Sequence, residues 1–155
     1  MRGMLKILSA LVAAGGLIAA SALPCAGATS QATELPIRSD YCEAQPDHSA
    51  DCARAVAKLK ADNVKAWKGN YGGQRNVSYC LSTGCGNLVA INKMLGCAWR
   101  IVIIGSGSSE VDVGDIANIK YECGRLDPAE LSVARGQAAA IFQAVYKRSL
   151  PAVSW

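Results

Sequence analysis

Cysteine and histidine are the residues whose chemistry this chain could use. The sequence contains seven cysteines and one histidine, His48. A zinc site needs closely spaced cysteine or histidine ligands, and a thioredoxin-type redox site needs C-x-x-C. The chain has no C-x-x-C, and its cysteine spacings are irregular. We therefore expect no metal and no cofactor.

Six cysteines remain once an N-terminal leader is removed, and an even number in an exported domain predicts structural disulfides. They are Cys42, Cys52, Cys80, Cys85, Cys97 and Cys123. Proximity in the sequence favours the pairing Cys42–Cys52, Cys80–Cys85 and Cys97–Cys123. A link between Cys80 and Cys97 is the alternative, and spacing alone does not decide between the two. Each disulfide is expected to stabilise the fold by about 2–4 kcal/mol.

A catalytic interpretation of His48 rests on its neighbour Asp47, but adjacent residues rarely place a carboxylate behind an imidazole. The hydrolase pattern G-x-S-x-G and the penicillin-type patterns S-x-x-K and K-T-G are absent. The order of Glu110, Asp112 and Asp115 does not match a calcium-binding loop. No base is recognisable beside any serine or thiol. We therefore expect no catalytic residue and no enzymatic activity.

The first 28 residues are typical of a signal peptide. Arg2 and Lys6 give a positive start, residues 7–23 are apolar, and residues 26–28 form a small-x-small cleavage motif. Cleavage after Ala28 is expected, and the mature protein is expected to be periplasmic or secreted. An uncleaved leader that anchors the chain is the alternative, because the apolar segment is long enough to span a bilayer. Contact with the membrane is expected only through this leader.

The charge of the chain excludes one class of partner and suggests another. Beyond the leader the sequence carries 14 basic and 12 acidic side chains, a net charge of +2. That excess is too small to predict nucleic-acid binding. Residues 51–75 hold six basic and two acidic residues, whereas residues 110–130 hold two basic and six acidic ones. Most of these charges should lie on solvated faces, but the basic stretch could attract an acidic partner.

Helices are the elements that must position these residues. Residues 29–48 are polar, contain two prolines and show no period, so an extended arm held by Cys42 is expected there. From residue 49 to about 150 apolar residues recur at helical spacing, which predicts one α-helical domain. Two places weaken the first helical run of this domain, Asp62-Asn63 and Gly69-Asn70, and a split is expected at one or both of them.

The later helices have clearer boundaries. Helices are expected over about 72–83, ending at Gly84, over about 92–104, and from about Asp112 to Gly124. The last helix begins at 127–130 with a capping box and a proline at its first position. Strand-like sequence is nearly absent, and the β-branched run 101–104 also suits a buried helix face. The predicted fold class is all-α.

The segment at about 72–104 resembles the Sel-one-like repeat, a relative of the tetratricopeptide repeat that pairs two antiparallel helices. The residues that carry the resemblance are Gln74, Asn76, Val77 and Tyr79 in the first helix, Gly84, Gly86 and Val89 in the loop, and Ala98 and Trp99 in the second helix. It covers one repeat, and a single repeat cannot bury its own faces. Flanking helices are therefore expected to cap it, with Trp67, Tyr79 and Trp99 as packing residues. A role as an exposed ligand platform is the alternative for any of these three rings.

Sel-one-like repeats generally serve as interaction scaffolds, so the resemblance implies binding to another protein. We expect an exported, non-catalytic interaction module of the bacterial cell envelope whose partner is an envelope protein with an acidic surface. The alternative is an envelope enzyme or ligand-binding protein that acts on peptidoglycan fragments or β-lactams, since some cysteine-rich relatives are associated with that activity. The missing nucleophile–base pair favours the binding module.

Overall fold

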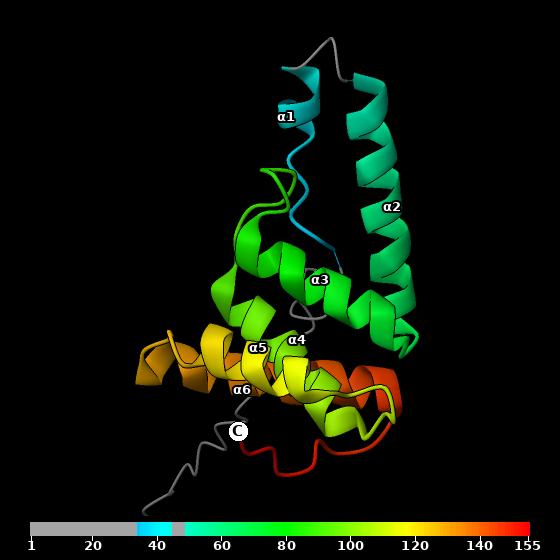
Figure 1. Cartoon of the computed structure of the whole chain (residues 1–155). Coiled ribbons are helices and arrows are strands. Elements are labelled where there is room, and N and C mark those ends of the chain that lie inside the picture. The colour runs from blue at the N-terminus through cyan, green and yellow to red at the C-terminus, as the bar shows by residue number, and fades with distance from the viewer. Residues whose placement is uncertain (1–33, 45–48) are drawn as a thin grey trace, which may run out of the picture.

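Six helices make up the part of the chain that the computed structural model describes, residues 34–44 and 49–155 (Figure 1). They are α1 (Ser39–Glu43), α2 (Ser49–Trp67), α3 (Tyr71–Thr83), α4 (Lys93–Ser106), α5 (Val113–Cys123) and α6 (Pro128–Tyr146). Over the described residues, β structure is limited to one antiparallel bridge between Ile37 and Val89. The predicted all-α class is confirmed. The leader, Asp47 and His48 lie outside the described residues.

Side chains at the helix starts explain where four of the helices begin. Asn70 and Asn92 accept hydrogen bonds from the backbone N–H groups of Gly73 and Leu95, at 2.8 and 3.0 Å. Asp112 and Asp127 each form a complete capping box, which satisfies donors that the first helical turn leaves free. The expected caps of the last two helices are therefore confirmed. The end of α3 at Gly84, with φ of 80°, is confirmed as well.

Helix α2 corrects one expectation, because it runs unbroken through Asp62 and Asn63. The side chain of Asp62 does not compete with the helix backbone, since it accepts hydrogen bonds from Lys58 at 2.6 Å and from Asn76 of α3 at 2.9 Å. The chain breaks only at the second expected place, at Gly69, whose φ is 81°, just before the cap of α3.

The arm 29–48 is also more structured than expected where it is described. Its residues 39–43 form the short helix α1. Just before this helix, backbone hydrogen bonds join Arg38 to Leu88 at 2.8 Å and Ala90 to Pro36 at 2.9 Å. The arm is thus fastened to the α3–α4 loop by its backbone as well as to α2 by the Cys42–Cys52 disulfide.

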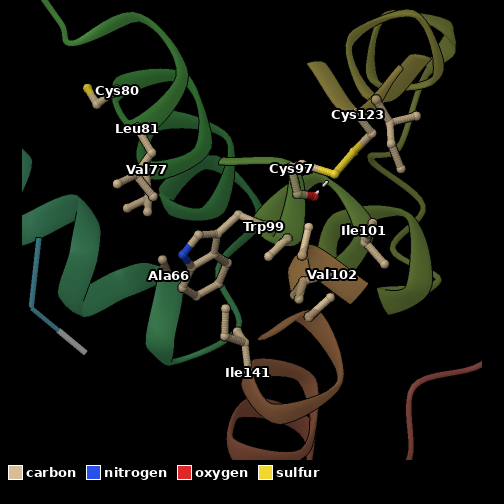
Figure 2. Packing of buried hydrophobic residues seen from close by; sticks show 14 of the residues in the cluster. Ala66, Val77, Cys80, Leu81, Cys97, Trp99, Ile101, Val102, Cys123 and Ile141 are labelled. Carbon is tan, nitrogen blue, oxygen red and sulfur yellow. Dashed lines mark hydrogen bonds between the residues drawn. A yellow bond between two sulfur atoms is a disulfide. The ribbon is translucent and has the colours of Figure 1, made fainter. Parts of the chain in front are cut away.

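The core centres on α4, which packs against α3, α5 and α6, while α2 packs against α3. Figure 2 shows the Trp99 side chain between Ala66 of α2 and Ile141 of α6. Trp99 is 1% exposed, and its ring meets the ring of Trp67 edge to face at 5.2 Å. Trp99 is therefore a packing residue, as predicted. Its ring packs α4 against α2 and α6, and so its role extends beyond the predicted α3–α4 hairpin.

Residues beyond 150 belong to the packed domain, although the predicted boundary excludes them. Val153 and Trp155 lie against the core, and Arg135 stacks over the Trp155 ring at 5.1 Å. Gly105 makes room for this tail: a Cβ there would lie 2.6 Å from a methyl group of Leu150. The C-terminal segment thus covers the α4–α6 contact.

Three disulfides fasten the fold: Cys42–Cys52, Cys80–Cys85 and Cys97–Cys123. This is the pairing that proximity in the sequence favours, and the alternative between Cys80 and Cys97 is not formed. The three links join α1 to α2, the end of α3 to its own loop, and α4 to α5.

The close approach of α2 and α3 gives a testable prediction. A Cβ at Gly73 would lie 2.7 Å from the backbone nitrogen of Ala66 and 2.7 Å from the carbonyl oxygen of Asp62. Gly73→Ala should therefore lower the free energy of unfolding by about 1–3 kcal/mol, because two backbones must separate. The neighbouring Gly72→Ala meets only Asn70, at 3.6 Å. It should be neutral or stabilise by up to about 1 kcal/mol. Urea denaturation of both variants measures the difference, and equal effects would contradict the close packing.

Candidate functional site

A cleft of about 760 Å³ opens between α3 and α5, and we call it the tyrosine cleft. Helix α4 packs against both α3 and α5. The lining residues are Tyr71, Gly72, Arg75, Asn76, Tyr79, Thr83, Arg100, Glu110, Asn118, Tyr121 and Glu122. Tyr79 and Tyr121 are 55% and 64% exposed. The cleft therefore offers aromatic rings on its walls and charged and amide groups between them.

The floor of the tyrosine cleft is a fixed polar network around Glu122. Arg100 of α4 donates through Nη2 to Glu122 Oε1 at 2.8 Å, with the two side chains only 4% and 11% exposed. Ser82 of α3 donates to the other carboxylate oxygen at 2.7 Å, and Ser78 lies 3.3 Å from that oxygen. The carboxylate of α5 is thus bound by side chains of both α3 and α4.

Asp115 of α5 lies next to the lining residues Tyr71 and Arg75, and its own side chain is fully buried. Its carboxylate accepts from the Tyr71 hydroxyl at 2.6 Å and lies 3.2 Å from Nε of Arg75. Burial, the hydrogen bond to Asp115 and the charge of that carboxylate raise the pKa of Tyr71 above 10.0. Tyr71 therefore remains a neutral hydrogen-bond donor at physiological pH. Arg75 also lies 3.9 Å from Asp112, so it links the basic stretch 51–75 to the acidic stretch 110–130.

A second, smaller cavity of about 280 Å³ lies on the other side of α3, and we call it the α2–α3 pocket. Its lining comes from α2, from α3 and from the loop closed by Cys80–Cys85: Ala55, Lys58, Leu59, Asp62, Asn76, Tyr79, Cys80, Cys85 and Leu88. Asn76 and Tyr79 border both cavities. The walls are mostly apolar, and the polar groups gather at Asp62.

Asp62 is the one acidic side chain in the lining of the α2–α3 pocket, and its pKa is shifted. Burial raises the pKa of Asp62, but hydrogen bonds from Lys58 and Asn76 and the charges of Lys58 and Lys65 outweigh it and lower the pKa below the ordinary 3.8. The charged form is therefore preferred in the folded protein. The Lys65 ammonium lies farther from this carboxylate, at 3.9 Å.

A lowered pKa has a consequence for stability that can be measured. Above about pH 5 Asp62 is ionised in both the folded and the unfolded chain, and its contribution is fully present. As the pH falls below 3.8 the unfolded chain takes up the proton first, so this contribution is lost progressively through the folded-state pKa. Asp62→Asn should therefore flatten the acid side of a plot of unfolding free energy against pH. Parallel profiles for Asp62→Asn and the parent would contradict this.

The residues that carry the family resemblance fall into two groups. Ala98 and Trp99 are buried, and buried Gln74 donates to the Ala66 carbonyl at 3.3 Å and to Tyr146 at 3.0 Å. Gly84 and Gly86 have the positive φ values that the tight loop requires, 80° and 69°. Asn76 and Tyr79, by contrast, face the two cavities. The expectation that Tyr79 is a packing residue is wrong, because more than half of it is exposed.

Sequence reasoning missed the tyrosine cleft, although a pattern for it exists. Tyr71, Arg75, Tyr79 and Thr83 follow one another at four-residue steps, which places them on one face of α3. Such a stripe of aromatic and polar residues on an exposed helix face indicates a binding surface better than a set of charges does. The pattern gives no information about the second wall of the cleft, because no local sequence feature indicates that α5 faces α3.

The expectation that no base lies beside a serine needs a correction, because Glu122 contacts both Ser78 and Ser82. Ser78 is fully buried and also donates to the Gly96 carbonyl at 2.9 Å, so a substrate cannot reach it. The Ser82 hydroxyl is engaged with a carboxylate that Arg100 already neutralises. The arrangement ties α3, α4 and α5 together. Within 34–44 and 49–155, no group of three or more histidine, cysteine or acidic residues is placed to hold a metal ion.

No protein-family model, curated protein or solved structure matches this chain. Among the described helices, none has the length and apolar character needed to cross a membrane.

Proposed function

We propose that this chain is an exported α-helical module of the bacterial cell envelope that binds another protein in the tyrosine cleft and catalyses no reaction. The observation that carries the proposal is the cleft itself, with Tyr71, Tyr79 and Tyr121 on its walls. Tyrosine and arginine are enriched where proteins bind one another, because they supply large contact areas together with a polar end. The resemblance to Sel-one-like repeats supports the same class of function.

The dimensions of the tyrosine cleft suit a polypeptide segment. Helix α3 has 13 residues, so its exposed face is about 20 Å long at 1.5 Å per residue. An extended segment of about six residues has the same length. The charged side chains of the lining, Arg75 and Arg100 against Glu110 and Glu122, balance one another. Recognition would therefore rest on stacking and hydrogen bonds along the segment.

Site-specific photo-crosslinking in cells tests this function. A photo-reactive phenylalanine derivative replaces Tyr79 or Tyr121 in the cleft and, as the matched control, Val133, an exposed apolar residue of α6. We expect a discrete protein adduct at both cleft positions and none at Val133. The adduct should persist with Ser82→Ala, because the proposed function needs no nucleophile. Equal adducts at all three positions, or none at the cleft positions, would contradict the proposal.

Export is the second part of the proposed function. It is supported by the leader pattern and by three disulfides, which form in oxidising compartments. N-terminal sequencing of the protein from an envelope fraction should begin at Thr29, and non-reducing mass spectrometry should show six hydrogens fewer than the reduced chain. An intact Met1 in the membrane fraction would instead indicate the anchored alternative.

A further inference from the structure

The α2–α3 pocket has features that the tyrosine cleft does not explain. Its walls are the ring of Tyr79, the Cys80–Cys85 disulfide and the side chains of Ala55, Leu59 and Leu88. Its volume of about 280 Å³ falls just below the range of about 300–1,000 Å³ in which whole small molecules bind. A cavity of this size and lining suits a single apolar side chain.

Positive charge is in excess beside the pocket. Lys58 of α2 lines the pocket and pairs with Asp62 at 2.6 Å, and Lys65 lies outside the lining but 3.9 Å from the same carboxylate. These three side chains carry a net charge of +1. The side chains of Lys58 and Lys65 are 70% and 60% exposed, so both ammonium groups remain accessible to a ligand. Over the whole of α2, four basic residues face two aspartates, and the helix carries +2. An incoming segment with carboxylates is therefore attracted to this side of α3.

Asn76 and Tyr79 connect the pocket to the tyrosine cleft, because each borders both cavities. A segment that lies in the cleft can thus cross α3 at these two residues and continue over α2. There the segment meets the apolar α2–α3 pocket and the lysines beside it. Buried apolar anchors surrounded by a polar rim are the usual centres of binding energy in protein interfaces.

We propose that the α2–α3 pocket receives one apolar side chain of an acidic segment of the partner protein, whose carboxylates face Lys58 and Lys65. This inference rests on the proposed function and assigns the partner its chemistry: an aliphatic anchor flanked by acidic residues. The pocket selects the anchor by shape, and the lysines select its neighbours by charge.

A peptide titration tests the assignment directly. The full chain, expressed with its leader and purified in its oxidised form, is labelled with ¹⁵N, and its backbone amide shifts are followed as acetyl-EELEE-amide is added. We expect saturable shifts at Ala55, Leu59, Tyr79 and Cys85, and weaker binding at higher salt. Two control peptides separate the contributions: acetyl-EEGEE-amide lacks the anchor, and acetyl-KKLKK-amide reverses the charge. Both should bind much more weakly.

Matched variants place the binding in the pocket. Ala55→Phe fills the cavity and should weaken acetyl-EELEE-amide at least about tenfold, whereas Ala57→Phe, the same change at an exposed position of α2, should stay within about twofold of the parent. Lys58→Met should weaken binding more than Lys60→Met, since Lys60 does not line the pocket.

The outcomes separate this inference from the function on which it rests. Equal binding of acetyl-EEGEE-amide would mean a charged surface without an anchor site, and unchanged affinity in Ala55→Phe would place the peptide elsewhere. A response to none of the peptides would mean that another occupant fills the pocket. Each of these results overturns the inference while leaving crosslinks at Tyr121, which lines the tyrosine cleft and not the α2–α3 pocket, as evidence for the proposed function. Missing crosslinks at Tyr121 together with normal peptide titration would overturn the proposed cleft instead.

Discussion

Replacing Trp99 with alanine should lower the free energy of unfolding by about 3–5 kcal/mol, the usual loss when a large buried aromatic side chain is removed. Trp99 is 1% exposed and sits where α2, α4 and α6 meet, in edge-to-face contact with Trp67. The surrounding side chains cannot collapse into the space easily, because they belong to separate helices. Denaturation with urea, with the disulfides intact, measures the change.

Trp155 provides the matched control, because it is the same residue type in a partly exposed place. Its ring stacks under Arg135 at 5.1 Å, and such contacts at accessible sites contribute about 0.5–1 kcal/mol. Trp155→Ala should therefore be clearly milder than Trp99→Ala. A loss below about 1 kcal/mol for Trp99→Ala would mean that the ring is not part of the core.

The helices could be predicted from the sequence where their ends are determined locally. The side chains of Asp112 and Asp127 each cap a helix by accepting a hydrogen bond from a backbone N–H only three residues further along the chain. Gly84 ends α3 in a left-handed backbone conformation that favours glycine. The continuity of α2 could not be predicted, because Asp62 is accommodated by Asn76, which lies on another helix. Local sequence patterns define the helices, and contacts between helices then decide whether a helix continues through a residue with low helix propensity.

The same distinction explains the candidate site. The stripe on α3 that ends in Thr83 is visible in the sequence, but the opposite wall of the cleft comes from α5, and only the assembled fold places α5 there. The disulfide pairing can be predicted more easily, because two links join cysteines that are close in sequence and the third joins the consecutive helices α4 and α5. Residues with partners nearby in the chain are therefore the ones that sequence reasoning places best.

The pair Arg100–Glu122 shows how much of the cleft depends on such distant contacts. Both side chains are nearly buried and joined at 2.8 Å. Removing one partner of a buried ion pair leaves the other charge without compensation, which typically lowers stability by about 3–5 kcal/mol. We therefore expect Arg100→Met to destabilise the protein by that amount, whereas Arg54→Met, which breaks the exposed pair with Asp51, should change stability by no more than about 1 kcal/mol.

The double variant Arg100→Met/Glu122→Leu separates stability from function. With both charges removed no isolated charge is buried, so the double variant should be more stable than the sum of the two single changes implies, by about 0.5–3 kcal/mol. Its tyrosine cleft would nevertheless have an apolar floor, and Ser82 would lose the carboxylate to which it donates. If the network serves binding, the double variant should fold and yet lose the photo-adduct at Tyr121. A folded double variant that keeps a full adduct would show that the network only joins the three helices, and the tyrosine walls would then carry recognition alone.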